Sequence, residues 1–525
     1  MSESLKSYNP VNGELVSEFP QTSAKDVDGH VQTARQGWSF WRETSLKERI
    51  LCLKRAQALL LERQDIFADM ITREMGRPKV ESKVLEISAS LDVIDYYARH
   101  ARQFLDARKV PLHNLFFKFR ESKLHIQPLG VLGIITPWNW PLLIPLGCIV
   151  PALVSGNAIV FKPSEITPGV GHLIHQLFLD AGVPEAVFQI IDGRGDVGSA
   201  LVQSNVEKLF FVGSTEVGQM IMEEASRSLK KVVLELGGHD PAIVCEDTDL
   251  DTTTSGIVWG SFCNAGQNCN GIERIYVHEK IKTDFLKAFL FKVQKLRSGN
   301  GMDPQTDLGP LALEKEVAKM ESIVRAAKAK GAEVLIGGSV ASELGKQFFQ
   351  PTVLYHPTKE SLPDDIEYFG PIVSIIPFSD DTEAIEMANG SQFGLAASVW
   401  SENKGRAERM ADQLEAGTVM INDAIVSFGI PESDWTGVKK SGIGWVHGEK
   451  GLAEMVNMKY VHRDRLSRSQ NFWWFPYHAD MLKQIRLGYE FLYRQSVVPK
   501  IKVAIPVLKA FFAYLVINRQ KKAKL

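Results

Sequence analysis

Short apolar strands alternate with helical segments along most of this 525-residue chain, and this alternation restricts the possible folds more than any other feature. One series of strands begins at 131–136 and a second begins at 242–244. Buried apolar strands separated by helices are typical of parallel sheets that carry helices on both faces. We therefore predict an α/β protein with two Rossmann-like domains, and we expect the chain to cross from one to the other near 236–238. The predicted strands are 131–136, 158–162, 187–191, 208–212, 242–244, 274–278, 333–336 and 372–377.

Two long helical patterns precede the alternation. Apolar residues recur at helical spacing from 24 to 75 and again from 80 to 102, with Gly76-Arg77-Pro78 between them. The segment 112–127 alternates instead and carries polar residues on both sides, which predicts an exposed β-hairpin.

The composition is that of an ordinary globular enzyme, with 45% apolar and 23% charged residues. Its net charge of −2 gives no indication of nucleic-acid binding. Five cysteines at irregular spacing fit neither a disulfide framework nor a zinc site, so we predict no metal and a reducing environment. The N-terminus lacks the apolar core of a signal peptide, and we expect a cytoplasmic protein.

Cys269 is the candidate nucleophile. It ends the stretch Phe-Cys-Asn-Ala-Gly-Gln-Asn-Cys and follows a turn of small residues inside an apolar region. A lone cysteine is usually a small core residue, so the interpretation depends on the motifs that accompany it. The neighbouring Cys263 belongs to an apolar helical run, and we predict that it is structural.

Two further residues suit chemistry at a thiol. A thiolate adds to a carbonyl group to give an alkoxide, which Asn139 in the turn Pro-Trp-Asn-Trp-Pro could stabilise with the backbone N–H of Cys269. Glu235 lies between Leu234 and Leu236, and burial there would raise its pKa toward the range of a general base. Taken alone, Asn139 would cap a turn and Glu235 would form a salt bridge.

A cofactor site is indicated by glycine-rich segments. Gly213-Ser214-Thr-Glu-Val-Gly218 ends a strand and opens a helix, whose N-terminal amides can face a phosphate. Gly193-Arg-Gly-Asp-Val-Gly198 also matches a dinucleotide pattern, but no acid follows about twenty residues later, so that fingerprint is incomplete.

Together with Lys162-Pro-Ser-Glu165 and Glu367-Tyr-Phe369-Gly-Pro, these motifs resemble the aldehyde dehydrogenase superfamily. They occur in the same order as in that family, and the resemblance covers about residues 9–464. The resemblance implies NAD(P)-dependent oxidation of an aldehyde through a cysteine thiohemiacetal and thioester. Lys162 and Glu165 match the residues that hold the adenosine ribose, while Glu367 and Phe369 match those at the nicotinamide. A carboxylate at Glu165 repels a 2′-phosphate and favours NAD over NADP. The cofactor-binding residues implied are Trp138, Lys162, Glu165, Gly213, Ser214, Gly218, Glu367 and Phe369.

The resemblance also implies a domain division. It gives a dinucleotide-binding domain (1–111 and 131–235), a catalytic domain (236–439), a hairpin element for oligomerisation (112–130 with 440–462) and a C-terminal extension (463–525). In the family the hairpin reaches a neighbouring subunit, so we expect a homodimer or a homotetramer.

The chain departs from the family pattern in three places. His239 replaces a common lysine after Gly237-Gly238, and we expect it to be a structural histidine. The segment 430–437 replaces the usual Pro-Phe-Gly-Gly near the substrate entrance. A second glutamate, sometimes proposed as a proton relay, is absent from 444–448, so Glu235 would act alone or with water.

The C-terminal extension suggests a lipophilic substrate. Aromatic residues cluster at 471–478, residues 503–517 are apolar except for Lys509, and eight Lys or Arg with no acid lie between Phe491 and Leu525. This pattern favours an anchor on the membrane surface, although packing on the enzyme or an oligomer contact remain alternatives. A fatty or polyene aldehyde, such as an apocarotenoid, would fit. The rivals are a soluble semialdehyde dehydrogenase, a coenzyme A-acylating enzyme, against which Glu235 argues, and a non-catalytic scaffold.

Overall fold

The structure is a computed structural model that describes residues 4–114, 117–118, 120–358, 361, 364–465, 473–477, 479–493, 495, 504–506 and 509. The chain divides into two compact units. Unit 1 comprises Met1–Asp106 and Gln127–Asn457, and unit 2 comprises Ala107–Ile126 and Met458–Leu525. Both large sheets belong to unit 1, and the predicted division of that unit at 235/236 stays a prediction.

The first sheet of unit 1 has six strands within the described residues, of which all but the edge strand β19 are parallel. Its strands are buried and apolar, as the sequence predicts for a sheet covered on both faces. In spatial order they are β19 (Gly442–Ile443), β9 (Lys231–Glu235), β8 (Lys208–Val212), β5 (Val131–Ile135), β6 (Ala158–Lys162) and β7 (Phe188–Ile190). The helices that accompany it are α1 (Val27–Trp41), α2 (Leu46–Glu62), α3 (Gln64–Met75), α5 (Ala89–Leu105), α6 (Leu143–Val154), α7 (Pro168–Asp180), α8 (Gly195–Gln203) and α9 (Thr215–Ser226).

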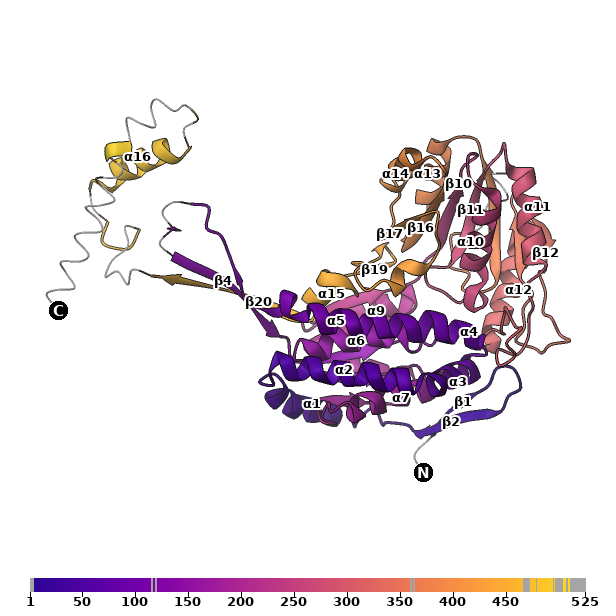
Figure 1. Ribbon diagram of the computed structural model, residues 1–525, viewed down its shortest axis with the longest axis horizontal. Helices are drawn as coiled ribbons and strands as arrows, with labels where there is room; N and C mark the ends of the chain where they lie inside the picture. Colours follow the sequence, from indigo (N-terminus) through magenta and orange to yellow (C-terminus); the bar gives the residue numbers. More distant parts are fainter. Residues whose placement is uncertain are drawn as a thin grey trace. The chain divides into compact units, whose positions relative to one another are not determined.

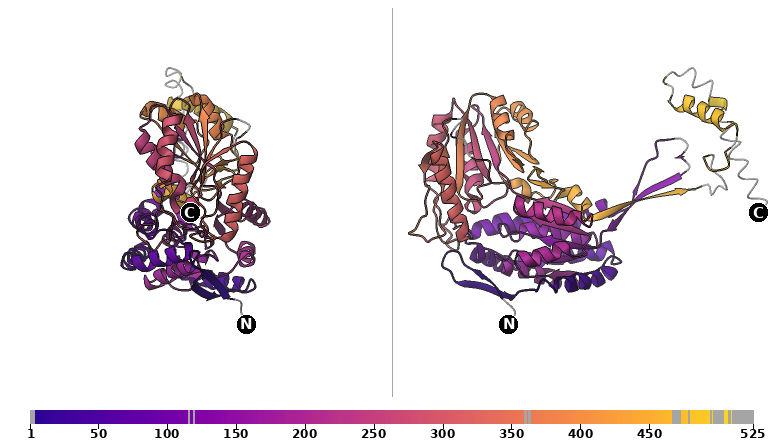
Figure 2. Two further views of the ribbon diagram at one scale, coloured as in Figure 1. Left: turned by 90° about the vertical axis from the view of Figure 1, so that its right-hand side faces the viewer. Right: turned by 180° about the vertical axis from the view of Figure 1, so that it is seen from behind.

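The second sheet has seven strands in the part of the chain that the structure describes, and only its edge strand β12 is antiparallel. Helices lie on either face of it, as the turned view in Figure 2 shows. In spatial order the strands are β12 (Glu333–Ile336), β13 (Thr352–Tyr355), β14 (Ile372–Phe378), β11 (Ile272–His278), β10 (Asp240–Val244), β16 (Ala396–Trp400) and β17 (Thr418–Ile421). The helices are α10 (Leu250–Phe262), α11 (Lys282–Val293), α12 (Glu314–Ala329), α13 (Asp381–Asn389) and α14 (Lys404–Ala411). The α/β prediction is therefore confirmed, and the chain passes between the sheets across 236–239.

The N-terminal helices are shorter than the sequence pattern predicts. The stretch 24–75 is three helices, because Ser45 caps the start of α2 and the chain breaks again at Arg63. Gly76 ends α3 in a left-handed conformation (φ 76°). The predicted helix at 80–102 consists of α4 (Lys79–Glu81), a π-helical turn η1 (Ser82–Ser88) and α5. Helix α5 packs between α2 and α6 (Figure 1), which brings η1 close to the loop before α6.

Unit 2 contains the predicted hairpin, formed by β3 (Arg108–Lys109) and β4 (Arg120–Pro128), with β20 (Val456–Asp464) as the third strand. Helix α16 (Met481–Tyr493) follows. No helix in the described part of the chain is both long enough and apolar enough to cross a membrane. Most of the apolar segment 503–517 and the basic residues that follow it lie outside the described residues.

Candidate active site

The thiol turn, residues 263–269, places Cys269 at the boundary between two cavities. Helix α10 ends at Phe262, and the next residues turn through left-handed conformations at Asn264 (φ 53°), Ala265 (φ 54°) and Gly266 (φ 71°). A side chain on Gly266 would meet the carbonyl of Gly370 at 2.1 Å, so only glycine fits there. This strained turn is the kind of backbone that folded proteins keep at functional sites. Cys269 is partly exposed, whereas Cys263 is buried, as predicted.

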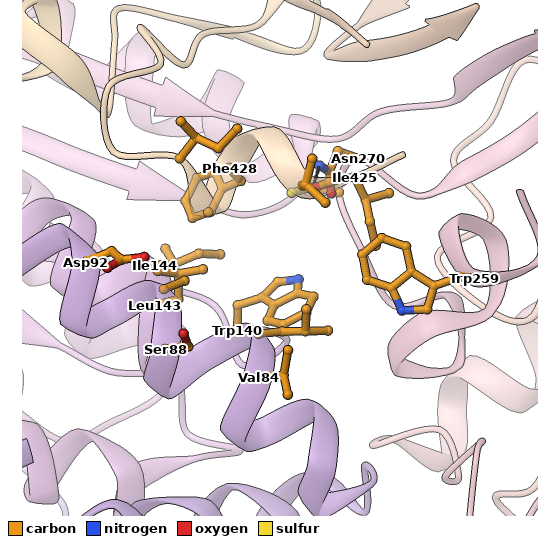
Figure 3. Close-up of a pocket in the computed structure, with 16 residues that line it drawn as sticks. Val84, Ser88, Asp92, Trp140, Leu143, Ile144, Trp259, Asn270, Ile425 and Phe428 are labelled. Carbon is orange, nitrogen blue, oxygen red and sulfur yellow. Dashed lines mark hydrogen bonds between the residues drawn. The ribbon is translucent and has the colours of Figure 1, made fainter. Parts of the chain in front are cut away.

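An apolar cavity of about 260 Å³ lies on one side of Cys269. Figure 3 shows the aromatic side chains of Trp140, Trp259 and Phe428 around it. Among its described lining residues no lysine or arginine occurs, and the one carboxylate is that of Asp92, which is exposed to solvent. Its lining consists of Val84, Leu85, Ser88, Ala89, Asp92, Trp140, Leu143, Ile144, Trp259, Cys269, Asn270, Ile425, Val426, Phe428, Gly429 and Ile430.

A charged cavity of about 230 Å³ lies on the other side, and Cys269 is the one residue that both linings share. Seven residues that the sequence selects for catalysis or cofactor binding meet here with the thiol: Trp138, Asn139, Gly213, Ser214, Glu235, Glu367 and Phe369. The motif analysis missed Lys315 and Lys319, which α12 directs into this lining. No local signal distinguishes them from the other lysines of an amphipathic helix.

Glu235 is the last residue of β9 and is 2% exposed. Burial raises its pKa to about 7, and the Glu367 carboxylate also raises it. Within the described part of the chain no hydrogen bond holds either carboxylate oxygen, although the Cys269 thiol and the Trp435 indole lie beside the group. Burial and this carboxylate together raise the pKa of the Cys269 thiol well above its usual range. The pair can therefore hold a proton near neutral pH.

Asn139 is 2% exposed and is fixed by the thiol turn. Its Nδ2 donates to the backbone carbonyl of Gln267 at 3.1 Å, and the backbone carbonyl of Asn139 accepts from Asn264 Nδ2 at 3.1 Å. An amide nitrogen has two hydrogens, so a second one is available for an oxyanion formed at Cys269.

Hydrogen bonds to buried groups fix the loop at 367–369. Glu367 Oε1 accepts from the backbone N–H of Gly238 at 3.1 Å, and the rings of Trp138 and Phe369 meet edge to face at 5.6 Å. Glu273, which the sequence did not indicate, accepts the N–H groups of both Tyr368 and Phe369 at 2.8 Å. His239 contacts Glu273 at 2.7 Å, so the prediction of a structural histidine is confirmed.

The charged cavity has groups suited to part of a dinucleotide. Ser214 caps α9, which begins at Thr215 directly after the Gly213-Ser214 turn, and the two lysines of α12 add positive charge for phosphate. A side chain on Gly237 would lie 2.9 Å from the Glu367 carboxylate, so the glycine lets that carboxylate approach the backbone closely. Lys162 Nζ and Glu165 Oε2 are 3.6 Å apart at the end of β6, and they and Gly218 lie outside the cavity lining.

Comparisons with known proteins agree with this fold. The sequence model of the aldehyde dehydrogenase family matches residues 1–461. A 4,4′-diapolycopene aldehyde oxidase from Methylomonas is 32% identical over 501 residues, which is 94% of this chain and 92% of that protein. An aldehyde dehydrogenase from Mycobacterium tuberculosis, solved with NAD+, is 31% identical and superposes with a TM-score of 0.84 over 88% of this chain and 95% of its own. An NADP-dependent enzyme from E. coli is 35% identical, with a TM-score of 0.83 over 88% and 95% of the two chains.

Proposed function

This chain belongs to the aldehyde dehydrogenase family and oxidises aldehydes with NAD or NADP, and from that premise we propose that its substrate is a lipophilic aldehyde, of the long-chain fatty or polyene class, which it converts to the carboxylate. The observation that carries the proposal is the apolar cavity, which reaches the thiol and has no cation in its described lining. A semialdehyde dehydrogenase would need a lysine or arginine there for the distal carboxylate.

Cys269 is the nucleophile in this proposal. Burial and Glu235 keep the thiol protonated at rest, so a proton has to leave as the sulfur adds to the aldehyde carbon. Glu235 is the neighbouring base, with a pKa near 7. Asn139 donates to the alkoxide that forms, and one such donor contributes about 3 kcal/mol to transition-state stabilisation.

Glu235 acts a second time after oxidation. When bound, the nicotinamide cofactor accepts the hydride that leaves the former aldehyde carbon. Once Glu235 has passed the thiol's proton to solvent, it takes a proton from the water that attacks the Cys269 thioester. The C–S bond breaks, the carboxylate leaves, and the sulfur recovers a proton as the thiol. Segment 444–448 offers no carboxylate to help, and burial lowers the pKa of His447 to about 4, so that side chain is neutral at physiological pH.

The cofactor is proposed to extend from the thiol toward the end of β6. Glu367 and Phe369 would hold the nicotinamide ribose and ring beside Trp138. Gly213, Ser214 and the first turn of α9, which includes Gly218, would hold phosphate. Lys162 and Glu165 would hold the adenosine ribose, and the Glu165 carboxylate favours NAD over NADP.

The polyene class has separate support. The relative named a 4,4′-diapolycopene aldehyde oxidase acts, by its name, on a polyene aldehyde. The aromatic side chains of Trp140, Trp259 and Phe428 give the apolar cavity flat surfaces against which a conjugated chain can pack. Association with a membrane surface would supply such a substrate, and the amphipathic helix α16 supports it, with Leu482 81% and Tyr489 60% exposed.

The test compares aldehydes of matched length. Octanal, its analogue with a distal carboxylate and a trimethylammonium aldehyde would be assayed by NADH formation, alongside an unbranched series from acetaldehyde upward. We expect kcat/KM to rise about fourfold for each CH2 group that enters the cavity, which corresponds to about 0.8 kcal/mol. A preference for the carboxylate analogue would establish a semialdehyde dehydrogenase instead. A preference for the cationic aldehyde would make Asp92 the selective residue and would also overturn the proposal.

A further inference from the structure

A cluster of buried charged residues lies beneath the loop that carries Asn139, and the chemistry above does not use it. Arg77 is 1% exposed and Glu86 is fully buried, and Arg77 donates from one terminal nitrogen to Glu86 Oε1 at 2.6 Å. Charged groups are costly to bury, so a pair in this position needs partners that repay its desolvation.

Glu86 and Arg77 both contact the residues that follow Asn139 in this loop. Glu86 Oε2 accepts the backbone N–H groups of Leu142 at 2.8 Å and Leu143 at 2.9 Å, where α6 begins. The Arg77 guanidinium lies over the Trp140 ring, 4.1 Å from its centroid. One carboxylate and one stacked cation thus fix the residues that follow Asn139.

A second carboxylate connects this cluster to the thiol turn. Glu81 lies 3.8 Å from Arg77 and accepts the backbone N–H of Asn264 with both oxygens at 3.2 Å. Asn264 Nδ2 donates in turn to the carbonyls of Asn139 and Gln267, at 3.1 and 3.2 Å. The oxyanion donor and the nucleophile's turn are therefore fixed to the same charged cluster.

The π-helical turn η1 explains how one short segment reaches both places. A π-turn holds an extra residue, and such turns are frequent at functional sites. Within η1, Glu86 points inward to α6, whereas Val84 and Ser88 line the apolar cavity (Figure 3). The segment that positions the oxyanion donor is thus also part of the substrate's surroundings.

We propose that Arg77 and Glu86 are positioning residues for the addition step, which set the place of Asn139 relative to Cys269 through the start of α6 and the Trp140 ring. This inference rests on the proposed function of those two residues. A displacement of about 1 Å at a reacting centre can cost about a hundredfold in rate, so a modest loosening of this cluster has a large kinetic effect.

Glu86→Gln tests the inference, with Glu74→Gln as the matched control. Glu74 is also 1% exposed and accepts two backbone N–H groups at the start of a helix, those of Gly169 at 3.0 Å and Val170 at 3.1 Å, but it contacts neither the loop nor the thiol turn. Both variants replace one accepting oxygen with an NH2 group, which has to face a hydrogen-bond donor in either orientation of the amide. We expect similar losses of thermal stability, with single-turnover NADH formation at 20 °C reduced at least about thirtyfold in Glu86→Gln and less than twofold in Glu74→Gln.

Three measurements separate positioning from general damage. In Glu86→Gln, the dissociation constant for NAD+ and the rate of Cys269 alkylation by iodoacetamide should stay within about twofold of the original protein, because neither depends on the oxyanion donor. Equal single-turnover rates per folded molecule in the two variants would overturn the inference. If Glu86→Gln does not fold, Arg77→Lys, which keeps the charge but loses the stacked plane, should slow the same step at least about threefold, and an unchanged rate would count against the inference. Failure of the unaltered enzyme to oxidise any aldehyde would instead refute the proposed function.

Discussion

Glu235 carries two proton transfers in the proposed reaction, and its environment determines the pH range in which it can act. Burial raises its pKa to about 7, and a general base has to be deprotonated to accept a proton. We therefore expect kcat/KM to rise with pH below about 7 and to level off above it. The measurement is a pH–rate profile with a neutral lipophilic aldehyde.

Glu235→Gln tests the origin of that profile. The amide cannot take a proton, so the limb near pH 7 should disappear and steady-state turnover should fall by about a hundredfold or more. A limb that persists unchanged in this variant would assign the titration to another group, of which Glu367, with its pKa raised to about 8, is the nearest alternative.

Ile430 offers a direct test of substrate selection by charge. It lines the apolar cavity, is 45% exposed and belongs to the segment that departs from the family pattern. Ile430→Arg should raise kcat/KM for an aldehyde with a distal carboxylate by about fivefold, as a partly exposed ion pair contributes about 1 kcal/mol, and should lower it for decanal. Ile430→Gln is the uncharged control and should give only the second effect. Equal behaviour of the two variants would place the distal end of the substrate elsewhere.

Local motifs predicted which residues meet at the thiol, but not what supports them. Asn139, Glu235 and Glu367 stand in short motifs whose residue types suit the chemistry, and the structure brings all three to Cys269. The supporting carboxylates could not be found this way. Glu86 and Glu273 bind backbone N–H groups far away in sequence, and a glutamate in a helix or strand is usually solvated, so their roles exist only in the tertiary structure.

At the scale of elements, the start of α2 was readable from the sequence and the π-turn was not. Ser45 and Glu48 form a capping box, in which the Ser45 hydroxyl accepts the Glu48 N–H at 3.2 Å and Glu48 Oε2 accepts the Ser45 N–H at 3.0 Å. A search for this signature would have divided the helix predicted at 24–75. In contrast, η1 differs from an α-helix by one residue per turn, a difference that periodicity over seven residues cannot resolve.

Ser45→Ala should lower the free energy of unfolding by about 1 kcal/mol, because the N–H of Glu48 loses its acceptor at the start of α2. Ser45→Asp keeps an accepting oxygen and should retain most of the stability. Urea unfolding of the full-length protein, followed by circular dichroism, measures the difference in the free energy of unfolding. Catalytic activity per folded molecule should stay the same in both variants. Equal stability of the two variants would show that the cap does not stabilise α2.

At the scale of the whole molecule, the alternation predicted two covered sheets but not the order of their strands. Strand order depends on pairings between distant segments, such as β5 with β8 or β10 with β16, and no local pattern encodes them. The crossing between the sheets was predictable, because Gly237-Gly238 interrupts two apolar strands.

The prediction that the protein binds a membrane surface concerns unit 2. The apolar side chains exposed on α16 should enter a lipid surface, while the basic residues of the C-terminal sequence favour anionic headgroups. In a flotation assay we expect the full chain to bind phosphatidylglycerol vesicles more than phosphatidylcholine vesicles, and less as salt increases. Leu482→Glu should reduce binding at least about threefold, whereas Leu61→Glu, at a leucine 55% exposed on α2, should not. Equal binding of both variants would remove α16 from the lipid contact.

The central claim, that Cys269 forms a thioester with a lipophilic aldehyde, can be measured directly. Glu235→Gln would be mixed with NAD+ and a long-chain aldehyde, quenched in acid and digested for mass spectrometry. A thiol gives up its proton to solvent far more readily than water does, so loss of the base slows hydrolysis of the thioester more than its formation. We therefore predict that the peptide containing Cys269 gains the mass of the acyl group and that NADH forms in a burst of no more than one equivalent per site. An unmodified Cys269 peptide alongside continued NADH formation, or an acyl group on another residue, would contradict the account.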